Sequence, residues 1–195
     1  MDAEGSDALE ALLSRRSVPA LQLSEPGPTP DQIATAIDAA LCAPDHGALK
    51  PLRMVLIQGD ARGRLSELLT RRMLERDPAV PPAKVDKTRR MLSTAPLVIA
   101  VGARVAASPK VPELEQLFSA AAGVMNLLNA FHALGYGAIW LTGPNAYDPQ
   151  VAASLRFAAD ERGLGFVYVG TVASSNKSPA PRLLEHAGAV RDWTG

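Results

Sequence analysis

The sequence FSAAAGVMNLLNAFHALG, residues 118–135, is the stretch that most restricts the fold of this chain. It makes up most of the longest helical candidate, residues 112–134, and it is apolar on nearly every side, which is typical of a central buried helix. Gly135 and Gly137 end the helical pattern, and AIWLT at 138–142 predicts a strand directly after them. The middle of the chain therefore combines a buried helix with a strand.

The segments on either side add further helices and strands. Apolar runs predict strands at 52–59, 97–103 and 165–173. Helical spacing of apolar residues predicts helices at 7–16, 61–76, 84–93 and 148–158. One more helix is predicted to start at Thr29-Pro30-Asp31-Gln32, and the Pro/Ser-rich stretch 174–182 is predicted to be a surface connection. Strands separated by helices, some single and some paired, predict a layered sheet of the α+β or α/β class.

Length and composition indicate one globular domain. A chain of 195 residues is close to the usual size of a domain, so we expect a single domain over residues 1–195. Its 20 basic residues balance 20 acidic ones, which argues against a nucleic-acid partner, because nucleic-acid-binding proteins need a basic surface. The single cysteine, Cys42, excludes an internal disulfide.

The sequence predicts neither a membrane segment nor a secretory signal. The longest purely apolar runs, such as LVIAV at 97–101, are much shorter than the roughly 20 residues that span a bilayer. The first ten residues are acidic and lack the positive start of a signal peptide. Ser14-Arg15-Arg16 matches part of a twin-arginine export signal, but no sustained apolar region follows it. We therefore expect a cytoplasmic protein with no membrane partner.

The usual signatures of side-chain catalysis are missing from the sequence. There is no G-x-S-x-G motif and no G-x-x-x-x-G-K-[ST] phosphate loop, and His46, His132 and His186 are too far apart to predict a metal site. Gly135-Tyr136-Gly137 precedes a strand instead of opening a helix, which argues against a dinucleotide-binding loop. Proteins without such residues often take their chemistry from an organic cofactor.

Three segments carry the remaining candidate binding residues. Arg15-Arg16-Ser17, at the end of the first helix, offers two guanidinium groups and a hydroxyl to a phosphate, although arginines there also complement the helix dipole. The polar loop 43–53 places His46 between a helix and a strand, although a lone histidine in a loop is also a common surface or core residue. In Ile139-Trp140-Leu141-Thr142-Gly143-Pro144 a strand runs into a glycine turn, which is a candidate ligand contact. The same residues are also typical of a core tryptophan beside a turn.

The order and spacing of these segments resemble the nitroreductase family of flavin enzymes, over nearly the whole chain. The shared features are a first helix that ends in RRS, a T-P-x-Q helix start, an A-P-D-H loop at 43–46 and the apolar long helix. They continue with G-x-G-x-I-W-x-x-G at 135–143 and the closing strand FVYVGT at 166–171. The resemblance is closest to the compact branch of the family whose helix–strand loop reads A-P-D-H.

The resemblance implies an α+β fold, with a central mixed or antiparallel sheet flanked by helices, in an entwined homodimer with FMN at its interface. It implies electron transfer from NAD(P)H through FMN to a nitroaromatic, a quinone or a similar small acceptor, without a catalytic side chain or a metal. His46 would reach from one subunit toward the site of the other. The residues that the resemblance implies for cofactor binding are Arg15, Arg16, Ser17, Cys42, His46, Lys50, Pro51, Leu141, Thr142 and Gly143.

The sequence departs from the family pattern in two places. Family members usually have another arginine shortly after RRS, where this chain has Val18-Pro19-Ala20, so Arg53 or another residue would have to replace it. Lys50-Pro51-Leu52 stands where the family usually has Gln-Pro-Trp. These departures leave open a protein that stores FMN with little turnover, or a dimer without a cofactor.

The arginine-rich region 61–93 is either a lid over the substrate pocket or a pair of helices with solvated faces.

Overall fold

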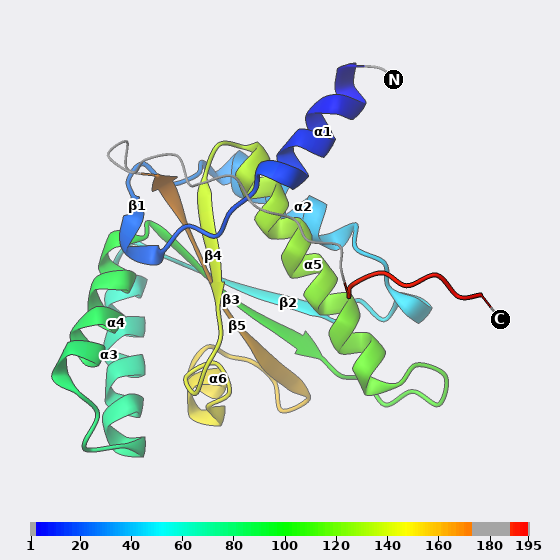
Figure 1. The fold of residues 1–195 in the computed structure, drawn as a ribbon. Helices are drawn as coiled ribbons and strands as arrows, with labels where there is room; N and C mark the ends of the chain where they lie inside the picture. Colours follow the sequence, from blue (N-terminus) through cyan, green and yellow to red (C-terminus); the bar gives the residue numbers. More distant parts are fainter. Residues whose placement is uncertain (1–2, 173–187, 195) are drawn as a thin grey trace.

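An antiparallel sheet runs through the centre of the molecule (Figure 1), in a computed structural model that describes residues 3–172 and 188–194. Its strands are β1 (Leu23–Ser24), β2 (Leu52–Gln58), β3 (Leu97–Arg104), β4 (Gly137–Leu141) and β5 (Glu161–Val172). β5 pairs with β3 along one edge and with β4 along the other, β2 pairs with the far edge of β3, and β1 pairs with the end of β5. The connection predicted at 174–182 lies outside the described residues.

Helices cover both faces of the sheet, which confirms the predicted α+β architecture (Figure 1). One face carries α2 (Pro30–Leu41) and α5 (Glu113–Ala133), and the other carries α3 (Asp60–Arg76), α4 (Pro82–Thr94) and α6 (Pro149–Ser154). α1 (Ala3–Ser14) projects from one end of the molecule, and two single turns, η1 (Ala20–Gln22) and η2 (His46–Ala48), lie in connections. No described helix is both long and apolar enough to cross a membrane.

β3 shows why the sequence contains a continuous apolar run at this point. Leu97, Ile99 and Val101 pack into the core under α2 and α5. Val98 and Ala100 point the opposite way, into the core under α3, α4 and α6. Since successive side chains of a strand alternate between its faces, a strand that is covered on both sides must be apolar throughout.

The start of α2 follows the predicted capping pattern. The backbone N–H of Gln32 donates to the hydroxyl of Thr29 (3.3 Å), and the backbone N–H of Thr29 donates to the side-chain oxygen of Gln32 (2.9 Å). The same Gln32 oxygen accepts a hydrogen bond from the Tyr136 hydroxyl (2.8 Å). The cap therefore also ties α2 to the segment that leads into β4.

The long helix predicted at 112–134 is buried on one side only within the described chain. One side of α5 is buried against the sheet and α2, through residues such as Val124, Leu127 and Phe131. The other side leaves Phe118 60% exposed and Met125 40% exposed. The apolar residues on that second side therefore have no cover within the described chain.

Several element ends differ from the predicted ones. The first helix ends at Ser14 instead of residue 16, because the next residues run alongside β4. The predicted helix 148–158 ends at Ser154, and Arg156 follows in a left-handed conformation (φ 63°) that stops helical hydrogen bonding. The last strand starts at Glu161, earlier than predicted, because its first residues pair with the end of β3.

Candidate functional site

The segment Arg15-Arg16-Ser17 lies against the outer edge of β4. Ser17 forms a parallel bridge with Ala138, and the backbone N–H of Val18 donates to the carbonyl oxygen of Ala138 (3.0 Å). The predicted phosphate-binding segment and the predicted strand-end segment Leu141–Gly143 therefore lie along one strand.

Arg16 turns back over the end of α1. One terminal nitrogen of its guanidinium, Nη1, donates to the carbonyl oxygens of Leu13 (3.0 Å), Ser14 (3.2 Å) and Arg15 (3.1 Å). This contact is the helix-end role that the sequence left as an alternative. A guanidinium carries five N–H donors, so a side chain that caps a helix with one nitrogen can still bind an anion with the others.

His132, in the last turn of α5, contacts the same helix end. Its Nε2 lies 2.9 Å from the hydroxyl oxygen of Ser14. Burial lowers the pKa of His132 below its ordinary value, and the charges of Arg15 and Arg16 lower it further. The two guanidinium groups thus produce a positive local field at this end of β4, which favours an anion.

A cavity of about 430 Å³ lies at the other end of β4, between α3, α4 and the loop that follows the strand. Leu141, Thr142 and Gly143, which the resemblance implies for cofactor binding, form one wall of it. Gly143 has a φ of +123°, a conformation that side-chain-bearing residues rarely adopt, so the turn at this wall requires glycine. The other lining residues are Leu69, Met73, Arg76, Asp77, Val80, Lys84, Thr88, Met91, Pro144, Asn145, Ala146, Phe166 and Tyr168.

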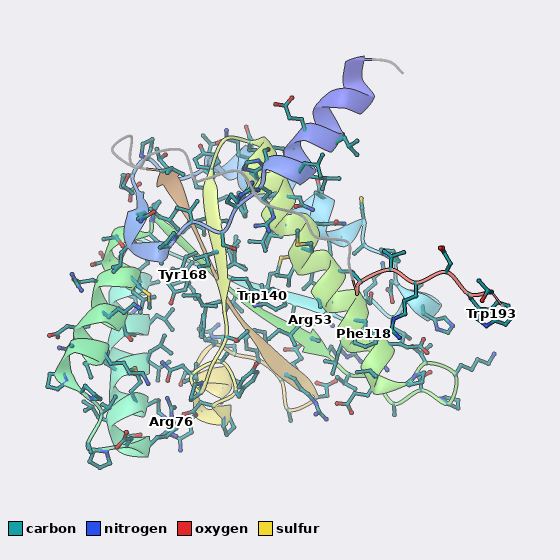
Figure 2. All side chains as sticks on the ribbon, in the orientation of Figure 1. Arg53, Arg76, Phe118, Trp140, Tyr168 and Trp193 are labelled. Atoms are coloured by element: carbon teal, nitrogen blue, oxygen red, sulfur yellow. The ribbon has the colours of Figure 1, made fainter. Side chains whose placement is uncertain are left out.

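The lining of this cavity is mainly apolar, with polar groups from a few positions. Phe166 and Tyr168 reach it from β5, and Figure 2 labels Tyr168 between α4 and β4. Burial raises the pKa of Tyr168 to about 12, so its hydroxyl stays protonated at neutral pH. An apolar pocket with a few polar groups is the usual composition of a small-molecule site.

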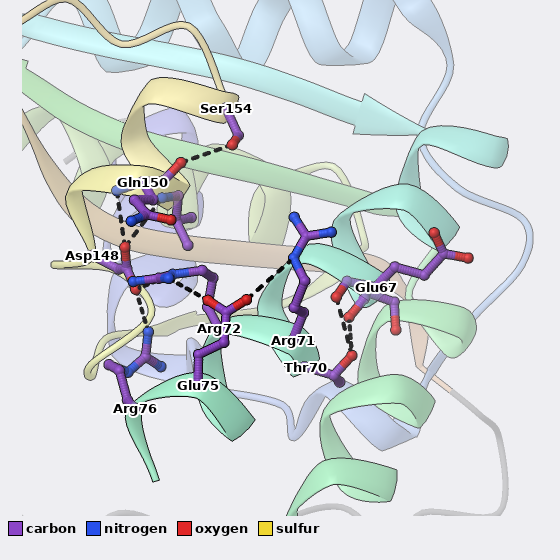
Figure 3. Close-up of polar contacts among 11 residues, drawn as sticks. Glu67, Thr70, Arg71, Arg72, Glu75, Arg76, Asp148, Gln150 and Ser154 are labelled. Atoms are coloured by element: carbon purple, nitrogen blue, oxygen red, sulfur yellow. Dashed lines mark hydrogen bonds and ion pairs between the residues drawn. The ribbon is translucent and has the colours of Figure 1, made fainter. Parts of the chain in front are cut away.

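A buried carboxylate fixes the loop that borders the cavity (Figure 3). The Asp148 side chain is 2% exposed and accepts hydrogen bonds from Arg72 Nε (2.9 Å) and from Arg76. It also accepts from the backbone N–H groups of Gln150 (2.9 Å) and Val151 (3.4 Å) at the start of α6. Burial alone would raise the pKa of Asp148, but these hydrogen bonds outweigh burial and hold the pKa below its ordinary value.

His46, Lys50 and Pro51 lie elsewhere, in the connection between α2 and β2. His46 Nδ1 is 2.6 Å from a carboxylate oxygen of Glu115 at the start of α5, and both side chains are exposed. The backbone N–H of Lys50 donates to the Asp45 side chain (2.6 Å). Lys50 and Pro51 border a second cavity of about 310 Å³ that contacts α2 and α5.

This second group is on the opposite face of the sheet from the cavity between α3 and α4. One chain therefore does not bring His46, Lys50 and Pro51 together with Leu141–Gly143. Cys42 is exposed at the end of α2, next to the same connection. Arg53, which the sequence offers as a replacement for the missing third arginine, pairs through its Nε with Glu161 (2.7 Å) on β5.

Sequence reasoning missed the walls that α3 and α4 give to the cavity. Both helices were interpreted from their arginines, as a lid or as solvated faces. The signal that could have corrected this was the apolar spacing of Leu65, Leu69 and Met73, which marks a buried side of α3. Tyr168 carried no such signal, because its access to a cavity depends on how separate elements pack.

Comparisons with known proteins identify the family of the chain. The family model described as "Nitroreductase family" matches residues 12–171. A protein of Escherichia coli K12 named "Putative NAD(P)H nitroreductase YdjA" is 36% identical over 165 residues, which covers 85% of this chain and 88% of that protein.

Two solved structures share the fold. The "Nitroreductase-like Family Protein" from Bacillus cereus has a TM-score of 0.76 at 18% identity and covers 96% of both chains. A Desulfovibrio desulfuricans protein crystallised in complex with FMN has a TM-score of 0.67 at 22% identity and covers 89% of this chain and 92% of that one. At these identities the two structures establish similarity of fold alone.

Proposed function

The chain belongs to the nitroreductase family, and from that premise we propose that it is an FMN-dependent oxidoreductase that carries electrons from NAD(P)H to a small organic acceptor. The acceptor class is a nitroaromatic, a quinone or a similar oxidised ring. The observation that carries the proposal is the position of two predicted cofactor segments along β4, with cationic residues at one end of the strand and a cavity at the other.

The residues at both ends of β4 fit FMN. Arg15, Arg16 and Ser17 offer charge-assisted hydrogen bonds to a phosphate, and the charges of the two arginines add to burial in lowering the pKa of the neighbouring His132. Leu141–Gly143 borders a cavity whose volume of about 430 Å³ lies in the range of small-molecule sites. An anionic tail at the first end and an aromatic ring at the second match the two halves of the cofactor.

When bound, FMN would supply the redox chemistry, so that NAD(P)H and one solvent proton convert a quinone to its hydroquinone and leave NAD(P)+. The chain itself would bind the phosphate, fix the ring and keep water away from it. Leu69, Met73 and Met91 give the cavity its apolar lining. The buried Asp148 keeps the loop 141–148 in place, because it binds two arginines of α3 while it caps α6.

A homodimer would complete the site. The exposed apolar side of α5, with Phe118 and Met125, and the exposed Leu9, Leu12 and Leu13 of α1 form surfaces that a second subunit would cover. The connection that carries His46, Lys50 and Pro51 would then contact the flavin site of the partner. We expect this dimer to act in the cytoplasm, where reduced nicotinamides are available.

The visible spectrum of the purified protein tests the proposal. We expect bound FMN to give yellow absorbance that bleaches when NADH or NADPH is added without oxygen and returns when a quinone is added. Absorbance that bleaches with dithionite but not with either nicotinamide would indicate a storage protein and contradict the enzyme assignment. A protein that takes up no FMN would contradict cofactor binding itself.

A further inference from the structure

Tyr168 has a largely buried side chain whose hydroxyl has no hydrogen-bond partner among the described residues. The residue is 3% exposed, in the middle of β5, opposite Ile139 on β4 and Val98 on β3. No residue within 3–172 or 188–194 donates to or accepts from its hydroxyl, although the side chain borders the cavity between α3 and α4 (Figure 2). Among the described residues the buried side-chain oxygen without a partner is Asn129 Oδ1, so the Tyr168 hydroxyl is open to the cavity, where a bound molecule can reach it.

The surroundings of Tyr168 indicate what the missing partner is. Its neighbours along the cavity wall are apolar or aromatic, among them Leu69, Met91 and Phe166. A planar aromatic molecule would pack against such side chains. A phenol is protonated at neutral pH, and burial raises the pKa of Tyr168 further, so its hydroxyl can donate to an acceptor oxygen or nitrogen at the edge of a ring and keeps its lone pairs as acceptors.

We infer that Tyr168 is a cofactor-positioning residue, whose hydroxyl donates a hydrogen bond to an acceptor atom of the flavin ring in the cavity between α3 and α4. The inference rests on the proposed function, since it names a contact within the FMN site. It adds a ring contact to the phosphate contacts predicted at Arg15, Arg16 and Ser17. A donor at the ring also stabilises negative charge that develops there on reduction.

The substitution Tyr168→Phe removes only this hydroxyl, and Tyr136→Phe is its matched control. The Tyr136 hydroxyl donates to Gln32 (2.8 Å) on the opposite face of the sheet, so its loss should affect folding and not the cofactor. Flavin affinity of the apoprotein, measured by fluorescence quenching, and thermal unfolding without flavin would be compared for both variants. The native protein is measured first, and failure to bind FMN or to react with NAD(P)H would overturn the proposed function and with it this inference.

We expect Tyr168→Phe to weaken FMN binding about three- to tenfold, as for the loss of one neutral hydrogen bond. Riboflavin, which has the ring without the phosphate, should lose the same factor, whereas Arg16→Ala should weaken FMN more than riboflavin. Thermal unfolding of the flavin-free variant should be unchanged or shifted upward, because the hydroxyl has no partner to lose. Tyr136→Phe should instead lower the unfolding temperature and leave flavin affinity unchanged.

The midpoint potential of the bound flavin provides a second readout. A hydrogen bond to a charged acceptor is about twice as strong as a neutral one, so the reduced form should lose more affinity than the oxidised form. A tenfold difference between the two losses corresponds to a potential about 30 mV lower in Tyr168→Phe. Unchanged flavin affinity together with an unchanged potential would overturn the inference, and so would a flavin-free variant that unfolds as readily as Tyr136→Phe.

Discussion

The exposed apolar side of α5 leads to a quantitative prediction about Phe118 (Figure 2). This side chain is 60% exposed in the single chain, so a dimer that covers it would bury that remaining surface. Complete burial of a phenylalanine is worth about 1.5–3 kcal/mol, which gives roughly 0.9–1.8 kcal/mol for the exposed part. A twofold axis places two copies in the interface, so Phe118→Ala should cost the dimer about 2–4 kcal/mol, a roughly 30- to 700-fold rise in its dissociation constant.

Sedimentation equilibrium at several concentrations measures this constant for the native protein and for the variant. Leu74→Ala is the control, because Leu74 is 42% exposed on α3, across the sheet from α5. We expect that control to leave the dissociation constant unchanged. We also expect Phe118→Ala to leave unfolding of the monomer almost unchanged, since Phe118 is outside both main core clusters.

Two results would refute this reasoning. One is a native protein that stays monomeric at micromolar concentration. The other is a dimer whose dissociation constant is the same with phenylalanine or alanine at position 118. The first result would also leave His46, Lys50 and Pro51 without a route to the flavin site, because one chain places them on the other face of the sheet.

Three further predictions concern charged residues. Arg16→Ala should weaken FMN binding by about 1.5–3 kcal/mol, measured by equilibrium dialysis. The control Arg104→Ala removes only a surface ion pair and should leave FMN binding unchanged. If the Arg16→Ala variant and the native protein bind FMN equally well, the phosphate contact is rejected. Asp148→Ala should lower the free energy of unfolding, measured in urea, by about 3–5 kcal/mol, because it leaves two buried arginine contacts without their carboxylate. The control Arg104→Ala should lower it by less than about 1 kcal/mol. Similar losses in the two variants would contradict a buried network around Asp148. Because the folded-state pKa of His132 is lowered, the unfolded chain binds its proton more readily, so stability should fall as pH drops below about 6.5. His132→Asn should flatten that part of the curve in melts between pH 7.5 and 5.5, and an unchanged slope would contradict it.

The sequence was sufficient for elements whose pattern is local. The run LVIAV predicted β3 because burial on both faces demands apolar residues throughout, and Thr29 with Gln32 predicted the start of α2 because a capping box involves neighbouring residues only. α5 was predicted as a helix with apolar residues on nearly every side, but the pattern did not show which side stays open within one chain. Whether an apolar helix face is covered depends on contacts with a second molecule or with distant segments of the chain. The local sequence pattern does not predict these contacts.

The candidate site could be predicted only in part, for the same reason. The binding roles of the RRS segment, of Leu141–Gly143 and of the His46 connection came from a resemblance and stay predictions. Asp148 meets arginines that lie more than 70 positions earlier in the chain, so no local pattern reveals the pair. Tyr168 looked like any residue of a buried strand until β5, α3 and α4 were placed together.

The pairing of Val18 with Ala138 has a consequence for the solubility of the protein. β4 is an outer strand, and unprotected outer strands expose backbone groups that can recruit strands of other molecules. The segment after α1 occupies part of that edge. A truncation that removes the residues up to and including Ser17 should therefore delete both arginines of this segment, expose part of the β4 edge and make the protein prone to aggregation. One truncation would thus weaken both ligand binding and solubility.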